Sequence, residues 1–418
     1  MVGFWQELRS GRWLTADRAR AYSLILLGLY GIAIVGWVAL SDGWVDRNGK
    51  PVGTDFSSFY AAGSLVLEGR AGDVYNMAAH FAREQQIFGA TTPYYGWLYP
   101  PLFLFVATPL ALLPYPIALI ASQGATLALY LAVIAAILRQ PRHQGGAIAR
   151  VWLLVAAAFP AVFINLGHGQ NGFLTAGLLG AALLALPHRP VLSGILLGLL
   201  AYKPQFGLLI PFALLAGAQW RTMIAAGLTV IALAGATTIA FGPEIWWVFA
   251  ASTETARKLL LEQGDVGFEK LQSVFAAIRL WGGGISLAYA VQGAASLITI
   301  GGVALIWRSS PDRNLKAALL MVATLLGSPH VLDYDLTIVG PAMAFMAASI
   351  YARGGLLDYE ISLMAVAWIT PLVARGIAGA SGLPIGLITI VALYGAVMRR
   401  ATEMRTGSVI AATGIAQA

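Results

Sequence analysis

The sequence has no cysteine and few charged residues. Without cysteine, the chain can form no disulfide and offers neither a thiolate nucleophile nor a cysteine ligand for a metal. Charged residues make up 11% of its 418 residues, whereas a soluble globular protein has about 25%. Five histidines are too few for a histidine-rich metal cage. The shortage of charge, taken with the apolar and glycine content described next, excludes a soluble enzyme, a disordered chain and a coiled coil.

Apolar residues and glycine are instead abundant. Apolar residues form 58% of the chain, and 47 residues are glycine, which membrane helices tolerate better than soluble ones do. We therefore predict an all-α fold, a polytopic integral-membrane helical bundle that forms a single domain over residues 1–418. Four arginines among residues 1–20, followed by the apolar run 21–40, predict an uncleaved first spanning helix rather than a signal peptide.

The apolar segments predict about twelve transmembrane helices, since a helix needs about 20 apolar residues to cross a bilayer. The candidates are residues 21–40, 116–138, 151–166, 171–187, 190–203, 205–219, 222–241, 285–307, 315–328, 334–351, 356–374 and 383–398. The apolar segment 100–113 is short and contains or adjoins three prolines. We therefore expect that segment to be re-entrant or interfacial.

The distribution of charge predicts the topology. With the N-terminus in the cytoplasm, 16 of the 26 basic residues and 6 acidic residues fall on the cytoplasmic side, and 10 basic and 13 acidic residues on the other. Cytoplasmic loops carry the excess of Lys and Arg, so we expect both termini in the cytoplasm of a multi-pass inner-membrane protein. Two long loops with amphipathic helices, residues 41–99 (the first long loop) and 242–284 (the second long loop), then face outward.

Polar residues gather at the outward ends of the expected spans. Because ionisable groups at membrane depth are costly, such residues indicate a functional site by default. The segments are Asp55-Phe56, Tyr99-Pro100-Pro101, residues 167–171, residues 202–205 and residues 328–335.

Several of these segments resemble a known family. Residues 53–63 read GTDFSSFYAAG, followed by LEG at 67–69 and VY at 74–75; YPP at 99–101, GQN at 169–171 and KPQ at 203–205 follow in order. These motifs resemble the signatures of glycosyltransferase family 87, a branch of the C-type glycosyltransferases that includes polyprenyl-phosphate-mannose-dependent mannosyltransferases. The resemblance spans roughly residues 21–350. It implies the C-type glycosyltransferase fold, and Asp55 matches the acidic residue that such enzymes use as catalytic base.

The chemistry expected outside the cytoplasmic membrane agrees with this resemblance. No nucleotide sugar is available there, so the donor must be lipid-linked, and its polyprenyl phosphate leaving group needs cations rather than a general acid. The acceptor hydroxyl needs a base, and a positioned base contributes about 10²–10⁴-fold in rate. We expect a membrane enzyme that transfers a hexose, with mannose as one candidate, to a lipid or glycan hydroxyl. We expect inversion, no metal, no cofactor and no nucleic-acid partner; the partners are donor, acceptor and membrane lipids.

The predicted site consists of Asp55 as catalytic base and a set that binds the donor phosphate or substrate. That set is Lys203, His330, His168, Gln170, Gln205, Tyr60, Tyr99 and Asp335. One elongated lipid-phosphate-sugar group can serve one site only if Lys203 and Asp55 lie within about 25 Å of each other, since ligands normally bind in one concave pocket.

Each of these residues also has a structural interpretation. Asp55 could cap a helix over residues 56–67, and Lys203 could extend its ammonium group to the interface. The histidines and Gln170 could satisfy backbone groups at helix ends, and the tyrosines could belong to an interfacial aromatic belt. Asp333 and Asp335 resemble an Asp-x-Asp metal motif, but alternate residues do not share one face of a helix.

Further alternatives concern the second long loop and the class of protein. The cations of that loop are Arg257, Lys258, Lys270 and Arg279. They could contact anionic lipid headgroups or the donor phosphate, or they could form a solvated face. A transporter or flippase of a lipid-linked saccharide should show repeats and charges at mid-span, neither of which is evident. A ligase that moves a whole glycan from a pyrophosphate carrier stays open.

Overall fold

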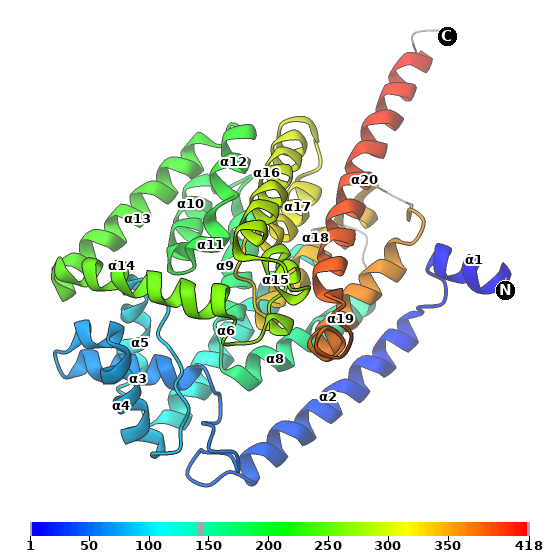
Figure 1. Ribbon diagram of the computed structural model, residues 1–418. Coiled ribbons are helices and arrows are strands. Elements are labelled where there is room, and N and C mark those ends of the chain that lie inside the picture. Colours follow the sequence, from blue (N-terminus) through cyan, green and yellow to red (C-terminus); the bar gives the residue numbers. More distant parts are fainter. Residues whose placement is uncertain (1, 141–145, 354, 416–418) are drawn as a thin grey trace.

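The computed structural model describes residues 2–140, 146–353 and 355–415, and within these ranges it is helical and has no β-strand (Figure 1). Helices account for 77% of the chain, and three isolated β-bridges occur in the two long loops and at residue 332. The all-α fold predicted from composition is therefore confirmed.

Seven helical segments are long and apolar enough to cross a membrane. They are α2 (Ala16–Ala39), α6 (Tyr115–Leu138), α13 (Trp220–Phe241), α16 (Ile285–Ser309), residues Asp333–Ala352, α19 (Glu360–Ser381) and residues Ile385–Glu403 of α20 (Ile385–Ile415). An eighth arises if α7 (Gly146–Ala157) and α8 (Pro160–His168), bent by 43° at their junction, form one broken span. The chain is a multi-pass membrane protein, although the predicted count of about twelve is not confirmed.

Apolar helices that are shorter than a membrane span account for the difference in count. Residues 171–187, 190–203, 205–219 and 315–328 form α9 (Gly172–Ala185), α10 (Pro190–Leu199) with a short 3-10 turn, α11 (Pro204–Gly207) with α12 (Ile210–Ala216), and α17 (Arg313–Leu326). Eleven residues of α17 and ten of α9 are buried. A helix that is apolar all round is buried inside a protein or spans a membrane, and the sequence alone does not separate the two.

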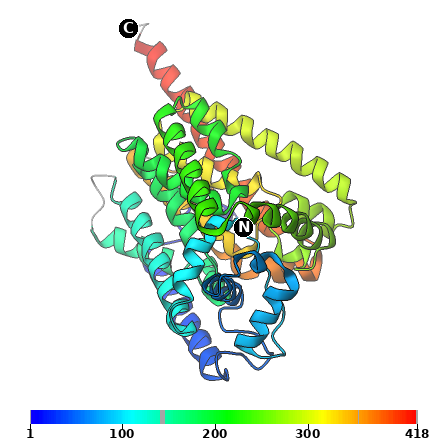
Figure 2. The same cartoon turned by 90° about the vertical axis from the view of Figure 1, so that its left-hand side faces the viewer.

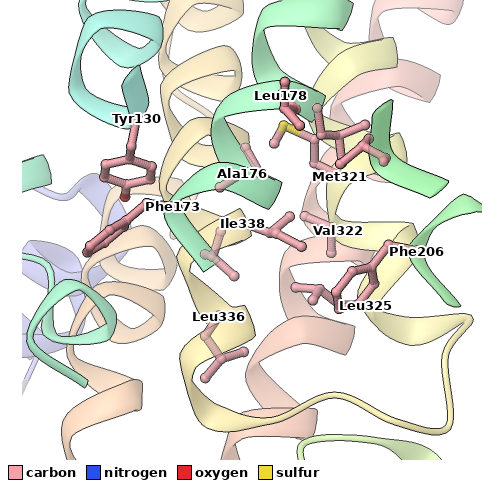
Figure 3. Packing of buried hydrophobic residues seen from close by; sticks show 14 of the residues in the cluster. Tyr130, Phe173, Ala176, Leu178, Phe206, Met321, Val322, Leu325, Leu336 and Ile338 are labelled. Carbon is pink, nitrogen blue, oxygen red and sulfur yellow. The ribbon is translucent and has the colours of Figure 1, made fainter. Parts of the chain in front are cut away.

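The core lies where α9 and α17 meet α18 (Val339–Arg353). Figure 3 shows Ala176 of α9 and Ile338 before α18 between Phe173 of α9 on one side and Met321, Val322 and Leu325 of α17 on the other. Near it, α10 approaches α13 so closely that a Cβ on Gly194 would lie 2.4 Å from the Thr222 carbonyl oxygen. Small residues permit such close backbone contact in membrane bundles.

The two long loops lie at one end of this bundle (Figures 1 and 2). The first carries α3 (Phe56–Leu67) and α4 (Met77–Phe88), and the predicted amphipathic helix 56–67 is confirmed to the residue. The second carries α14 (Glu244–Ala256), a π-helical turn at Arg257–Gln263, a 3-10 turn at Phe268–Lys270 and α15 (Val274–Leu280). The loops touch where Phe249 of α14 packs on Tyr75, with ring centroids 5.7 Å apart.

Candidate functional site

Asp55 immediately precedes α3, and its backbone docks on the end of α8. The Asp55 N–H donates to the His168 carbonyl at 3.0 Å. Its side chain makes no capping bond to α3, so the alternative role as a helix cap is not observed. One carboxylate oxygen accepts from Gln170 Nε2 at 3.0 Å, and the other accepts from the Thr54 hydroxyl at 3.3 Å and faces His168 Nδ1 at 3.7 Å.

Two opposing effects set the charge of Asp55. Burial raises the pKa of the carboxyl, but the neighbouring His168, the positive charge of Lys270 and the Gln170 hydrogen bond outweigh it, so the net pKa lies below its usual value. The carboxylate is therefore ionised at neutral pH. Its side chain remains 21% exposed and that of His168 22%, which leaves this edge of the site open to a ligand.

Gln170 is held by a network of buried amides. Gly169 ends α8 in the left-handed conformation (φ 61°), and a Cβ there would lie 2.6 Å from the Cβ of Phe56. The Gln170 side-chain oxygen then accepts from the Tyr99 hydroxyl at 3.0 Å. Its backbone oxygen accepts from Gln123 Nε2 at 3.0 Å and from Asn165 Nδ2 at 2.8 Å. Because its side-chain oxygen and its backbone oxygen are both engaged, Gln170 presents its side-chain N–H to Asp55 in a fixed orientation.

Sequence reasoning missed Gln123 and Asn165. Both are buried amides inside apolar segments, Gln123 in α6 and Asn165 in α8, and they bond to each other at 3.1 Å. Their position in apolar runs was the available signal, because buried polar groups are expected to be hydrogen-bonded and at membrane depth to be functional.

A short series of contacts joins Asp55 to Lys203. The His168 ring lies 5.9 Å from that of Tyr334, and Lys203 Nζ lies 5.2 Å from the Tyr334 ring centre. With the 3.7 Å contact between Asp55 and His168, these steps place the two charged groups well within the expected limit of about 25 Å for one site.

Lys203 does not stand free in this site. Its Nζ donates to Asp335 Oδ1 at 2.7 Å, with side-chain exposures of 4% and 2%. The second oxygen of Asp335 accepts the Leu332 N–H at 3.0 Å. The structure therefore brings together two predicted ligands, but as partners of each other, so the positive charge of Lys203 is already balanced.

The other predicted residues occupy different positions. His330 forms a tight turn with Ser328, and burial together with the charge of Lys203 lowers its pKa, so its imidazole is neutral at neutral pH. Gln205 lies half-buried on α11. The hydroxyl of Tyr60 donates to the Leu113 carbonyl at 2.9 Å. Tyr60 is thus engaged apart from the cluster around Asp55.

The part of the chain that the structure describes has no group of three or more His, Asp or Glu side chains that could hold a metal ion. A cavity of about 500 Å³ lies elsewhere in the first long loop, and its lining includes Asp42, Asp46, Arg47 and Thr91 but not Asp55.

These features define a class: a multi-pass helical membrane protein with an ionised carboxylate, amides, histidines and cations gathered at one end of the bundle. The chain belongs to glycosyltransferase family 87, whose family model matches residues 97–329, more than half of its length. The suspected family is therefore confirmed, and the protein is a membrane glycosyltransferase. The matched region includes Tyr99, His168, Gln170 and Lys203, whereas Asp55 precedes it. No curated protein and no solved structure matches the chain.

Proposed function

We propose that the protein transfers a hexose from a polyprenyl phosphate donor to a hydroxyl of a lipid or glycan, with Asp55 as general base. The observation that carries this proposal is the Asp55 carboxylate, which is held by Gln170 and His168, ionised, and open on one edge. Membership of a glycosyltransferase family supports a sugar donor and acceptor. The charge distribution supports an active site on the outer face of the cytoplasmic membrane, with both termini inside.

The proposed reaction is a single displacement. The acceptor oxygen forms a bond to the anomeric carbon while the bond from that carbon to the phosphate oxygen breaks. The acceptor proton passes to Asp55, and the phosphate leaves with the bonding electron pair, so the configuration inverts. A phosphate leaving group needs stabilisation of negative charge rather than a proton. One base and nearby cations therefore suffice.

The neighbouring residues take supporting roles in this proposal. Gln170 and His168 orient the carboxylate and keep it ionised, because donors to the charged form favour it. His330, neutral, is suited to donate a hydrogen bond to a phosphate or acceptor oxygen. Lys203 and Asp335 hold the segment with residues 330–335 against α11, so the predicted contact of Lys203 with phosphate requires this pair to open.

The test is sugar transfer by purified protein in a bilayer. Polyprenyl phosphates that carry labelled mannose, glucose or galactose are offered with lipid acceptors, and labelled product is measured. Asp55→Asn should abolish transfer, and Asp73→Asn, which removes an exposed acid of the same loop paired with Arg70, should not. Movement of intact donor across the bilayer without cleavage would instead indicate a flippase, and transfer of a whole glycan from a pyrophosphate carrier would indicate a ligase.

A further inference from the structure

The four cations of the second long loop are not equivalent. Arg257 pairs with Glu262, Lys258 pairs with Glu254 at 2.7 Å, and Arg279 donates to the carbonyls of Glu262 and Gly283 at 2.9 and 2.8 Å. Among the side chains that the structure describes, residues 3–140, 150–352 and 355–403, no hydrogen bond or ion pair engages the ammonium group of Lys270. Lys270 is therefore the cation of this loop that is left to meet a ligand.

The backbone around Lys270 is fixed against the segment that carries His330. Leu271 forms an antiparallel bridge with Leu332, and the Gln272 N–H donates to the Val331 carbonyl at 2.7 Å. In an antiparallel register, the residue before Leu271 faces the residue after Leu332. Lys270 therefore lies opposite Asp333, two residues from the Asp335 that pairs with Lys203.

The Gln272 side chain strengthens this placement. Its Nε2 donates to the Lys270 carbonyl at 3.1 Å, and its Oε1 lies so close to Gly386 that a Cβ there would come within 1.8 Å. The loop backbone is thus held between residues 331–332 and the start of α20. A cation on such a backbone is positioned more firmly than one on a solvated loop.

A second cation comes from α19. The 3-10 turn that ends in Lys270 packs along α19, where a Cβ on Gly379 would lie 3.6 Å from Glu269 Cγ. Arg375 precedes Gly379 by four residues and so lies on the same face of the helix. Arg375 is exposed and, like Lys270, has no hydrogen bond or ion pair with any residue whose side chain the structure describes.

Both cations act on the carboxylate of Asp333. The charges of Lys270 and Arg375 both reach Asp333, and the charge of Lys270 also reaches Asp55. Around Asp333 two positive groups therefore face one carboxylate, and one of them, Lys270, also acts on Asp55. Lys203, by contrast, has Asp335 as its own counter-ion.

We propose that Lys270 and Arg375 form the subsite that binds the phosphate of the lipid-linked donor. The inference deepens the proposed function and rests on it. An ammonium group supplies a mobile point charge, and a guanidinium group supplies a planar fork that fits two phosphate oxygens. Together they stabilise the negative charge that develops as the sugar leaves, a role that a fully paired lysine fills poorly. The second long loop is thereby part of the active site.

The test measures binding of farnesyl phosphate, a short polyprenyl monophosphate, to the full chain in phosphatidylcholine nanodiscs. Lys270→Met and Arg375→Gln should each raise its Kd about tenfold, the lower range for loss of a hydrogen bond to a charged group. The matched control is Lys258→Met, which removes the same charge from the same loop where Glu254 already pairs it; its Kd should stay within about twofold of the parent.

Further arms identify the ligand chemistry. Farnesol, which lacks the phosphate, and inorganic phosphate, which lacks the chain, should both compete weakly. Nanodiscs that contain phosphatidylglycerol distinguish a headgroup site, because displacement of farnesyl phosphate by that lipid would overturn a donor-specific subsite. Equal Kd values for Lys270→Met and Lys258→Met, or no binding by the parent, would also overturn it.

The test of the phosphate subsite can fail or succeed independently of the test of Asp55 as general base. Asp55→Asn should bind farnesyl phosphate at least as tightly as the parent, because a negative charge near the subsite is removed, and yet transfer no sugar. If that variant transfers sugar normally while Lys270→Met still binds the phosphate weakly, the base assignment is wrong and the subsite stands. If Asp55→Asn is inactive while Lys270→Met binds and transfers as the parent does, the subsite is wrong and the proposed function stands.

Discussion

Two carboxyl groups of the first long loop, Asp55 and Glu84, are held in opposite states. The pKa of Asp55 lies below its usual value, despite burial, because His168, Lys270 and Gln170 stabilise the charged form. Burial raises the pKa of Glu84 to about 8, although the Tyr95 N–H at 3.0 Å and the Ser57 hydroxyl at 3.4 Å donate to it. At neutral pH one carboxyl is therefore ionised and the other protonated.

The packing of α3 on α4 explains the difference. Glu84 and His80 are fully buried on α4 and lie 3.9 Å apart beneath Ser57 and Ser58 of α3. Burial lowers the pKa of His80 to about 4, so it provides no charge to ionise Glu84. Asp55 lies at the start of α3, next to His168 and Gln170 and within reach of the charge of Lys270. When the surroundings of two titratable groups move their pKa values in opposite directions, one group can react while the other has a structural role.

The largest expected effect on the transfer rate comes from replacing each of these two carboxyl groups by its amide. Asp55→Asn should lower transfer about 10²–10⁴-fold, because the amide cannot accept the acceptor proton. Its free energy of unfolding should stay within about 1 kcal/mol of the parent. Glu84→Gln, which resembles the protonated acid, should keep transfer within a few-fold. The measurement is initial rate under saturating donor, and equal losses in both variants would remove the distinction.

Transfer should not require added divalent metal. EDTA removes a bound metal, so sugar transfer is measured with and without it. If EDTA abolished transfer and Mg²⁺ or Mn²⁺ restored it, the site would need a metal, with Asp333 and Asp335 as its ligands.

A third carboxyl group, Asp335, extends the comparison, because a lysine in direct contact balances its charge. Lys203→Ala should destabilise the protein by about 3–5 kcal/mol, since it leaves a buried partner without its counter-charge. Lys203→Arg should retain part of the donor use, as charge is kept and geometry is not. Unfolding in detergent and KM for the donor are measured together. In the double variant Lys203→Met/Asp335→Asn stability should recover; if the donor KM recovers too, Lys203 does not bind phosphate.

The raised pKa of Glu84 predicts a pH dependence of stability. The folded chain holds this proton up to about pH 8, whereas the unfolded chain releases it near the ordinary value of 4.5. Stability from Glu84 is therefore lost as pH rises toward 8, by about 2 kcal/mol between pH 6.5 and 8. Below pH 6.5, the unfolded chain instead protonates His80, and the two slopes partly cancel. Thermal unfolding of Glu84→Gln should be flatter above pH 6.5, and an unchanged slope would contradict the raised pKa.

The smallest expected effect on transfer comes from Gln170, which acts through the pKa of Asp55. Gln170→Leu removes one hydrogen bond to the carboxylate, so the pKa of Asp55 should rise and transfer should fall about tenfold. The acidic limb of the pH–rate profile should move to higher pH, because the ionised base is the active form. A loss of rate with no movement of that limb would show that Gln170 acts on the substrate and not through Asp55.

The sequence by itself determined the class of protein and much of its local structure. The scarcity of charge and the long apolar runs require a membrane environment, since such surface cannot be buried otherwise. The order of the motifs indicated the family, and the pattern at 56–67 predicted a helix with the observed ends. These features depend on composition and on residues near one another in the chain, which are visible without a fold.

Only the tertiary structure decided which of these residues act together. Lys203 and Asp335 are 132 residues apart, and Asp55 and Gln170 are 115 apart, so no local pattern reveals that one cation is already paired and one carboxylate is held ionised. The sequence likewise presented four similar cations in the second long loop, and a single antiparallel bridge placed Lys270 opposite Asp333. Burial depends on every neighbouring helix. It keeps Glu84 neutral and places α9 and α17 in the interior of the bundle.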